Sequence, residues 1–168
     1  MSDIIINKVS ESGLVTINLE TYFPSDDIIS FDIQPLLFMG LILKEKEFRN
    51  ALQQIEWEKY SDKIVSVFCS ADAVIPVWAY MLIASALQPF AKEIHMGKPE
   101  QIQEQILLRN IRAIDISTFA DQRVVIKGCG EIPIGENAYL EITTKLRPVV
   151  KSIMYGEPCS TVPVYKKK

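Results

Sequence analysis

Residues 64–87, with the sequence IVSVFCSADAVIPVWAYMLIASAL, decide the fold class that the chain predicts. The first five of these residues form a β-branched, apolar run, which is typical of a buried strand. The apolar stretch that follows predicts a buried helix ending near Leu87, and Pro89 stops it. A strand followed directly by a helix is the repeating element of α/β proteins.

The same alternation continues toward the C-terminus. Further strands are predicted at residues 92–96, 123–127 and 152–155, and helices begin at Pro99 and at Asn137. Three strand–helix alternations predict an α/β fold: a layered, mainly parallel sheet with flanking helices.

The N-terminal part predicts a different arrangement. Residues 14–20 alternate between apolar and polar like a half-buried strand, and residues 27–33 form a second, shorter strand. Turn residues at 23–26 separate the two strands, so we expect an N-terminal β-hairpin added to the sheet. No linker or internal repeat is evident, which predicts a single domain. Its parts are N-terminal strands and an amphipathic helix at 1–60, a βα-repeating core at 61–165 and a basic tail at 166–168.

Composition and charge exclude several classes of protein. The 168 residues are 48% hydrophobic and 23% charged, as in globular proteins, and the net charge of −3 disfavours nucleic acid as a partner. The longest nearly apolar run, residues 74–87, is too short for a membrane span, which needs about 20 residues. Three cysteines and no recognisable signal peptide predict a cytoplasmic protein that does not act at a membrane.

The cysteines and the single histidine are the candidate ligands for a metal. Cys69, Cys129 and Cys159 each follow a predicted strand, and His95 lies near the end of a weaker one. The carboxyl ends of parallel strands share one edge of a sheet, so we expect these four side chains to converge. Three thiolates and an imidazole match a zinc site, and three thiolates alone match an iron–sulfur cluster with one open iron. The leading hypothesis is metal or iron–sulfur binding.

Two other functions stay open, and the sequence does not decide whether the protein is an enzyme. Because the chain has no C-x-x-C pair, the alternative is a binding or scaffold module in which the cysteines are structural, with a homo-oligomer as one form of assembly. A thiol enzyme would use Cys69, at the start of a helix, as nucleophile. Asp72, Glu157 and Lys127 lie near cysteines and are candidate acid–base residues.

A phosphate-binding loop is a weaker hypothesis. Gly128-Cys129-Gly130 stands between a predicted strand and a predicted helix, where a glycine-rich loop can hold phosphate. Pro133 occupies the place of the third glycine of such a loop, which argues against nucleotide binding. The small-molecule ligand, if any, is not identified by this pattern.

Several segments resemble those of a bacterial family of domains of unknown function. The two long segments are residues 69–82 (CSADAVIPVWAYML) and 155–163 (YGEPCSTVP), and the shorter ones lie at 7–14, 43–49 and 127–129. The resemblance implies no activity. It does imply that the three thiols are the common element, because each cysteine lies within a shared segment, whereas His95 does not.

Overall fold

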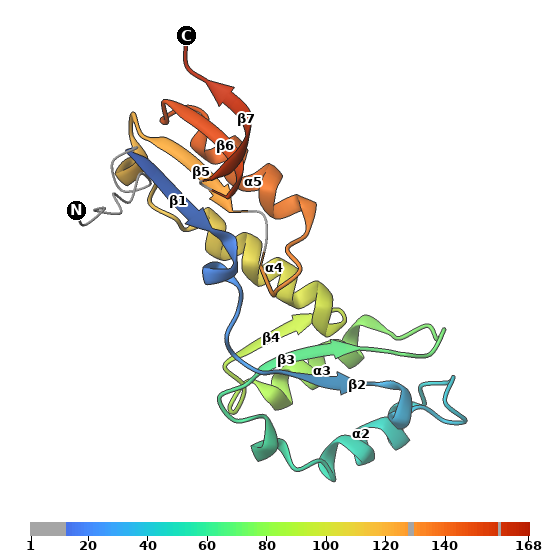
Figure 1. Cartoon of the computed structure of the whole chain (residues 1–168). Coiled ribbons are helices and arrows are strands. Elements are labelled where there is room, and N and C mark those ends of the chain that lie inside the picture. Colours follow the sequence, from blue (N-terminus) through green and yellow to red (C-terminus); the bar gives the residue numbers. More distant parts are fainter. Residues whose placement is uncertain (1–12, 128–129, 158) are drawn as a thin grey trace, which may run out of the picture. The chain divides into compact units, whose positions relative to one another are not determined.

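A computed structural model describes residues 13–127, 130–157 and 159–168 (Figure 1). It confirms the α/β class, since the described helices accompany two mostly parallel sheets. The chain divides into two compact units. Unit 1 comprises residues 1–24 and 104–168, and unit 2 comprises residues 25–103.

Unit 2 contains a three-stranded parallel sheet with helices packed on one face. Its strand order is β2-β3-β4. Val65 and Val67 of the central strand point to the core, where they meet Phe48 and Ile83 from the two helices. The elements are β2 (Ile28–Asp32), η2 (Gln34–Leu36), α2 (Glu45–Gln53), η3 (Trp57–Tyr60), β3 (Ile64–Phe68), α3 (Val77–Leu87) and β4 (Glu93–Met96).

Unit 1 repeats this design and adds a fourth strand. Its sheet has the order β1-β5-β6-β7, in which β7 alone runs antiparallel to its neighbour. Val124 and Ile153 of the sheet pack against Ile142 and Leu107 from the helices. The elements are β1 (Leu14–Asn18), η1 (Leu19–Tyr22), α4 (Pro99–Arg112, of which residues from Glu104 onward belong to this unit), η4 (Ile116–Phe119), β5 (Arg123–Lys127), α5 (Glu136–Leu146), β6 (Ser152–Glu157) and β7 (Ser160–Lys166).

The predicted N-terminal β-hairpin is wrong. β1 pairs in parallel with β5, and β2 pairs in parallel with β3, so the two strands belong to different sheets (Figure 1). The turn residues between them mark the point at which the chain passes from unit 1 to unit 2. The expected single sheet is therefore also wrong, because β3 and β4 form one sheet and β5 and β6 another.

The structure contains an internal repeat that the sequence pattern did not reveal. Four elements recur in the same order and at a constant spacing: η3, β3, α3 and β4 each begin 59 positions before η4, β5, α5 and β6 (64 against 123, 77 against 136). The buried Ala79, Ile83 and Leu87 of α3 correspond to Ala138, Ile142 and Leu146 of α5.

Special backbone conformations follow the same repeat. Gly97 and Gly156 occupy equivalent positions and have φ angles of 132° and 121°, which favour glycine. Asp62 and Asp121, also equivalent, have φ angles of 58° and 54° in the left-handed region, which aspartate tolerates better than most residues. The turn before β3 and the turn before β5 therefore share a left-handed aspartate, and the glycines recur at equivalent positions, although Gly97 follows β4 and Gly156 lies within β6.

The basic tail was predicted to begin at residue 166, but that residue still belongs to a strand. Lys166 is the last residue of β7 and lies opposite Ser152 of β6. The next residue, Lys167, donates its backbone N–H to the Lys151 carbonyl at 2.9 Å, and its Nζ lies 3.1 Å from the Asp121 carboxylate.

In the described part of the chain, no helix combines the length and apolar character that crossing a membrane requires.

Candidate functional site

The two described cysteines do not follow strands of one sheet. Cys69 comes directly after β3 in unit 2 and is half-buried, whereas Cys159 is exposed between β6 and β7 in unit 1. Cys129 lies outside the described residues. The expectation of one shared strand edge is therefore wrong, because the strands concerned are divided between two sheets.

His95 lies on the opposite side of the unit 2 sheet from Cys69. Its neighbour Ile94 packs into the core, as Cys69 does, and successive side chains of a strand alternate between faces. His95 therefore shares the face opposite Val65 and Val67 with Ser66, its partner in register, and its Nε2 lies 2.8 Å from an oxygen of Glu93. Among the residues that the structure describes, no group of three or more His, Cys, Asp or Glu is placed to hold a metal ion.

The candidate acid–base residues are also distributed over both units. Asp72 is exposed in the loop between β3 and α3 of unit 2. Glu157 ends β6 in unit 1, where its carboxylate lies 3.9 Å from the Nζ of Lys127. Lys127 and Glu157, both candidates from the sequence, are therefore brought together by the structure.

At the carboxyl edge of the unit 2 sheet, Asp32 connects the ends of two strands. Its Oδ1 accepts the N–H groups of Gln34 and Ser70 at 3.0 and 2.9 Å, and its Oδ2 accepts the Ser70 hydroxyl at 2.6 Å. Burial disfavours the charge, but these hydrogen bonds outweigh it and hold the pKa of Asp32 below its ordinary value. Nearby, burial and then the charge of Cys69 raise the pKa of Tyr80. Both oxygens of the Asp32 carboxylate thus accept hydrogen bonds from within the protein.

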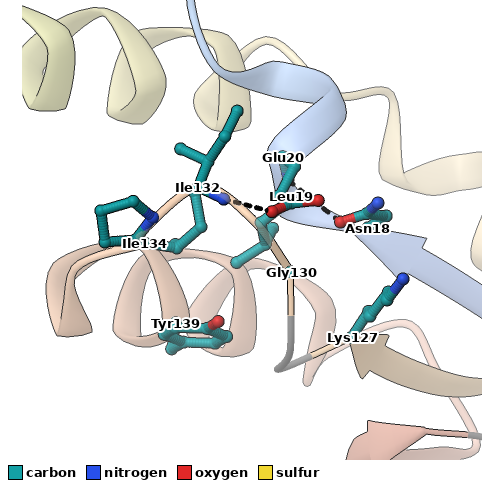
Figure 2. A pocket seen from close by; sticks show the side chains of 9 residues that line it. Asn18, Leu19, Glu20, Lys127, Gly130, Ile132, Ile134 and Tyr139 are labelled. Atoms are coloured by element: carbon teal, nitrogen blue, oxygen red, sulfur yellow. Dashed lines mark hydrogen bonds between the residues drawn. The ribbon is translucent and has the colours of Figure 1, made fainter.

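The carboxyl edge of the unit 1 sheet instead borders a pocket of about 390 Å³ (Figure 2). Its wall combines the end of β1, the start of η1, the end of β5, the loop that precedes α5 and the first turn of that helix. The lining residues are Asn18, Leu19, Glu20, Lys127, Gly130, Ile132, Pro133, Ile134 and Tyr139.

Glu20 is held in a fixed orientation across this pocket. The side chain of Asn18 accepts the Glu20 N–H at 3.2 Å, which turns the chain at the end of β1. The carboxylate of Glu20 then accepts the Ile132 N–H at 2.7 Å, as Figure 2 shows. Gly130 makes this approach feasible, because a Cβ at that position would overlap the Glu20 carboxylate. The pocket loop is therefore attached to η1, directly after β1, through one carboxylate.

The other polar groups of the pocket come from β5 and α5. Lys127 is half-buried, ends β5 and lies opposite Asn18 in the register of the sheet. Tyr139 contributes a phenol, and its ring meets Tyr155 edge-on with the ring centres 5.7 Å apart. Figure 2 shows Lys127 beside Asn18 at the strand ends and Tyr139 on the α5 side. A cation, a carboxylate, an amide and a phenol thus surround one pocket.

The repeat identifies what distinguishes this edge from its counterpart in unit 2. The last residue of the central strand is Lys127 in unit 1 but Phe68 in unit 2. Tyr139 corresponds to Tyr80, and Gly130 corresponds to Ala71. The cation and the glycine that admits Glu20 are therefore particular to unit 1.

Sequence reasoning missed Asn18, Glu20 and Tyr139, and it considered Lys127 only as a neighbour of a cysteine. Asn18 and Glu20 lie more than 100 residues from the pocket loop, and only the pairing of β1 with β5 brings them to it. The one available signal was the Gly128-Cys129-Gly130 loop after a strand, which borders this region in sequence.

Comparison with known proteins adds a family but no activity. No curated protein and no solved structure is detectably similar to the chain. The family model described as "Protein of unknown function (DUF2480)" matches residues 3–167, which is nearly the whole length. The chain therefore belongs to this family, as the resemblance of its cysteine-containing segments implied.

Proposed function

We propose that the protein binds a small polar molecule in the pocket at the carboxyl edge of the unit 1 sheet. The observation that carries this proposal is the convergence of Lys127, Glu20, Asn18 and Tyr139 on one hollow of about 390 Å³. Ligand sites usually have volumes of about 300–1,000 Å³, and in parallel α/β sheets they lie beyond the carboxyl ends of the strands. The binding-module hypothesis from the sequence is thus the one that this geometry favours.

The lining groups define the chemistry of the ligand. The Lys127 ammonium donates hydrogen bonds and attracts an anionic group. The Glu20 carboxylate accepts hydrogen bonds, as it does from the Ile132 N–H, so it selects a ligand that carries a hydroxyl or amino group. Leu19 and Ile134 supply apolar surface for a short carbon skeleton. A small hydroxy acid or amino acid meets these three requirements.

The test is a calorimetric titration of the purified protein with a panel of 2-hydroxy and 2-amino carboxylic acids. We expect at least one member to bind and to raise the melting temperature. A ligand present at 100 times its Kd stabilises the folded state by about 2.7 kcal/mol, which corresponds to a rise of roughly 5–10 °C.

Two variants make the test specific. Lys127→Met keeps the apolar stem but removes the charge, so the affinity should fall at least 10-fold. Lys46→Met, at an exposed position of α2 in unit 2, is the matched control and should leave the affinity unchanged. The proposal fails if no acid of the panel binds, or if Lys127→Met binds as tightly as the unaltered protein.

The metal and thiol hypotheses remain predictions of the sequence, together with the cytoplasmic location and a homo-oligomeric state. They assign zinc or an iron–sulfur cluster to Cys69, Cys129 and Cys159, with His95 as a fourth ligand, or a nucleophilic role to Cys69. Elemental analysis and an absorption spectrum of protein purified without oxygen test the metal. Selective alkylation of Cys69 near neutral pH tests the nucleophile.

A further inference from the structure

The carboxyl end of the unit 2 sheet carries exposed apolar side chains on two loops. Residues 37–44 connect η2 to α2, residues 69–76 connect β3 to α3, and both loops lie beyond the ends of β2 and β3 (Figure 1). In these loops, Met39 is 82% exposed and Val74 is 93% exposed. Two further apolar side chains, one turn apart at the start of α3, are exposed as well. We call this surface the apolar end of unit 2; its six residues are Met39, Leu41, Ile42, Val74, Val77 and Met81.

Both loops are held by hydrogen bonds or by packing, so this exposure is a property of the fold. Phe38 and Ile42 exchange two backbone hydrogen bonds, of 2.8 and 3.1 Å, across the first loop. In the second loop, Ala73 and Ile75 pack against the core, whereas Val74 between them points to solvent.

Local backbone chemistry does not explain the apolar residues at two of these positions. Val77 is the first residue of α3, and its counterpart in the repeat, Glu136, is the first residue of α5. An acidic residue stabilises the first turn of a helix through the helix dipole, and α3 has none there. Met39 has a φ of 52°, a conformation that asparagine and aspartate adopt more readily. Exposed apolar residues that go against the local preference indicate a surface that a partner covers.

The apolar end is large enough to form the apolar part of a dimer interface. A fully exposed aliphatic side chain presents roughly 100 Å² of apolar surface, so these six present roughly 400 Å² at their observed exposures. A stable interface buries about 800 Å² on each partner, of which about 60% is apolar. The six side chains therefore supply most of the apolar area that one side of such an interface needs.

The charged residues beside the apolar end favour a protein surface over a membrane surface. Lys44 pairs with Glu47 at 3.4 Å. Arg49 pairs with Glu45 at 2.9 Å, and Asp72 is exposed in the second loop. An anionic lipid surface attracts clustered cations rather than balanced ion pairs. An apolar surface with balanced charges at its border instead suits a protein partner of the same character.

We propose that two copies of the chain form a dimer through the apolar end of unit 2. Of the exposed large hydrophobic residues that the structure describes, seven of twelve lie between residues 38 and 81, so the best match for this surface is the same surface of a second copy. Met39 and Met81 have flexible side chains that adapt to such a contact. The inference does not depend on the function proposed for the unit 1 pocket, because no residue of the apolar end lines that pocket.

Sedimentation equilibrium of the full chain at about 1–100 µM tests the proposal, and we expect a monomer–dimer equilibrium. Val77→Glu and Met81→Lys each place a charge within an apolar interface, so each should raise the Kd of the dimer by about 10-fold or more. Val77→Glu should fold, because glutamate begins the equivalent helix α5 and suits the N-terminal end of a helix.

Leu140→Lys is the matched control, because Leu140 is the counterpart of Met81 on α5 and both are 67% exposed. It should leave the Kd of the dimer unchanged. Circular dichroism and the melting temperature show that each variant is folded, and Met39→Ser replaces a variant that is not.

Several results would overturn the proposal. The unaltered chain could remain monomeric over the whole concentration range, or folded variants of the apolar end could dimerise normally. Leu140→Lys could weaken the dimer as much as Met81→Lys, which would place the effect outside the apolar end. A parallel sedimentation with vesicles of phosphatidylcholine and phosphatidic acid tests a membrane: vesicle binding by a monomeric chain that Met81→Lys abolishes also contradicts the dimer.

Discussion

Replacing Gly130 with alanine should destabilise the protein through its effect on Glu20. A Cβ at residue 130 would overlap both oxygens of the Glu20 carboxylate. The obstructing atoms are the end of a flexible side chain, so the carboxylate would rotate away rather than the backbone move. The rotation would break the 2.7 Å hydrogen bond to the Ile132 N–H, which attaches the pocket loop to η1.

The size of the effect follows from two opposing contributions. A hydrogen bond to a charged group stabilises a folded protein by about 1.5–3 kcal/mol. Alanine in place of glycine, where the backbone permits it, returns about 0.4–1 kcal/mol by restricting the unfolded chain. The net loss is therefore about 1–2 kcal/mol, or roughly 2–8 °C in melting temperature.

A double-mutant cycle isolates this mechanism. Thermal unfolding is measured for Gly130→Ala, for Glu20→Ala and for the variant that carries both changes. Without the carboxylate there is nothing for the Cβ to displace, so Gly130→Ala should become neutral or slightly stabilising in the Glu20→Ala protein. If Gly130→Ala lowers the melting temperature equally in both backgrounds, the reasoning is refuted, and the loss comes from the loop backbone itself.

Two further predictions concern Asp32 and the repeated glycines. The pKa of Asp32 is lower in the folded protein than in the unfolded chain, where it is about 3.9. The ionised carboxylate therefore stabilises the fold above the pKa of the unfolded chain. This contribution is lost as the pH falls through the pKa of the folded protein. Ser70→Ala should therefore cost about 1 kcal/mol at neutral pH, reduced by solvent screening, and progressively less below about pH 4 in a pH series of unfolding curves. Gly156→Ala should destabilise the protein more than Gly97→Ala, although both positions have a positive φ. A Cβ at residue 156 would lie 2.5 Å from the backbone carbonyl oxygen of Ser160, whereas a Cβ at residue 97 would lie 3.0 Å from the side chain of Gln101. Equal melting temperatures of the two glycine variants would contradict this ranking.

The local helices and strands could be predicted from the sequence because the spacing of apolar residues reflects which side chains are buried. Residues 64–68 and 123–127 form strands as predicted, and the apolar stretch before Leu87 forms α3. Pairing was not predictable in the same way, since a parallel partner can lie anywhere along the chain. Leu14 pairs with Arg123, which no turn signal between residues 14 and 33 can indicate.

The internal repeat was hidden for a related physical reason. The two copies share burial and backbone conformation more than side-chain identity. Pairs such as Ser66 and Val125 are fully buried in equivalent strands although one is polar and the other apolar. The sequence argument about the cysteines failed at the same point, because strand ends share an edge only when the strands share a sheet.

The pairing of β1 with β5 also determines the order in which the protein can fold during synthesis. The strands of unit 2, residues 25–103, pair only with one another. Its sheet can therefore form while the ribosome is still translating unit 1. Strand β1 is made first but finds its partner only after residue 127 has emerged. Among the described strands, β1 therefore remains unpaired for the longest part of synthesis, and a chain that ends before β5 would leave the edge of β1 unpaired.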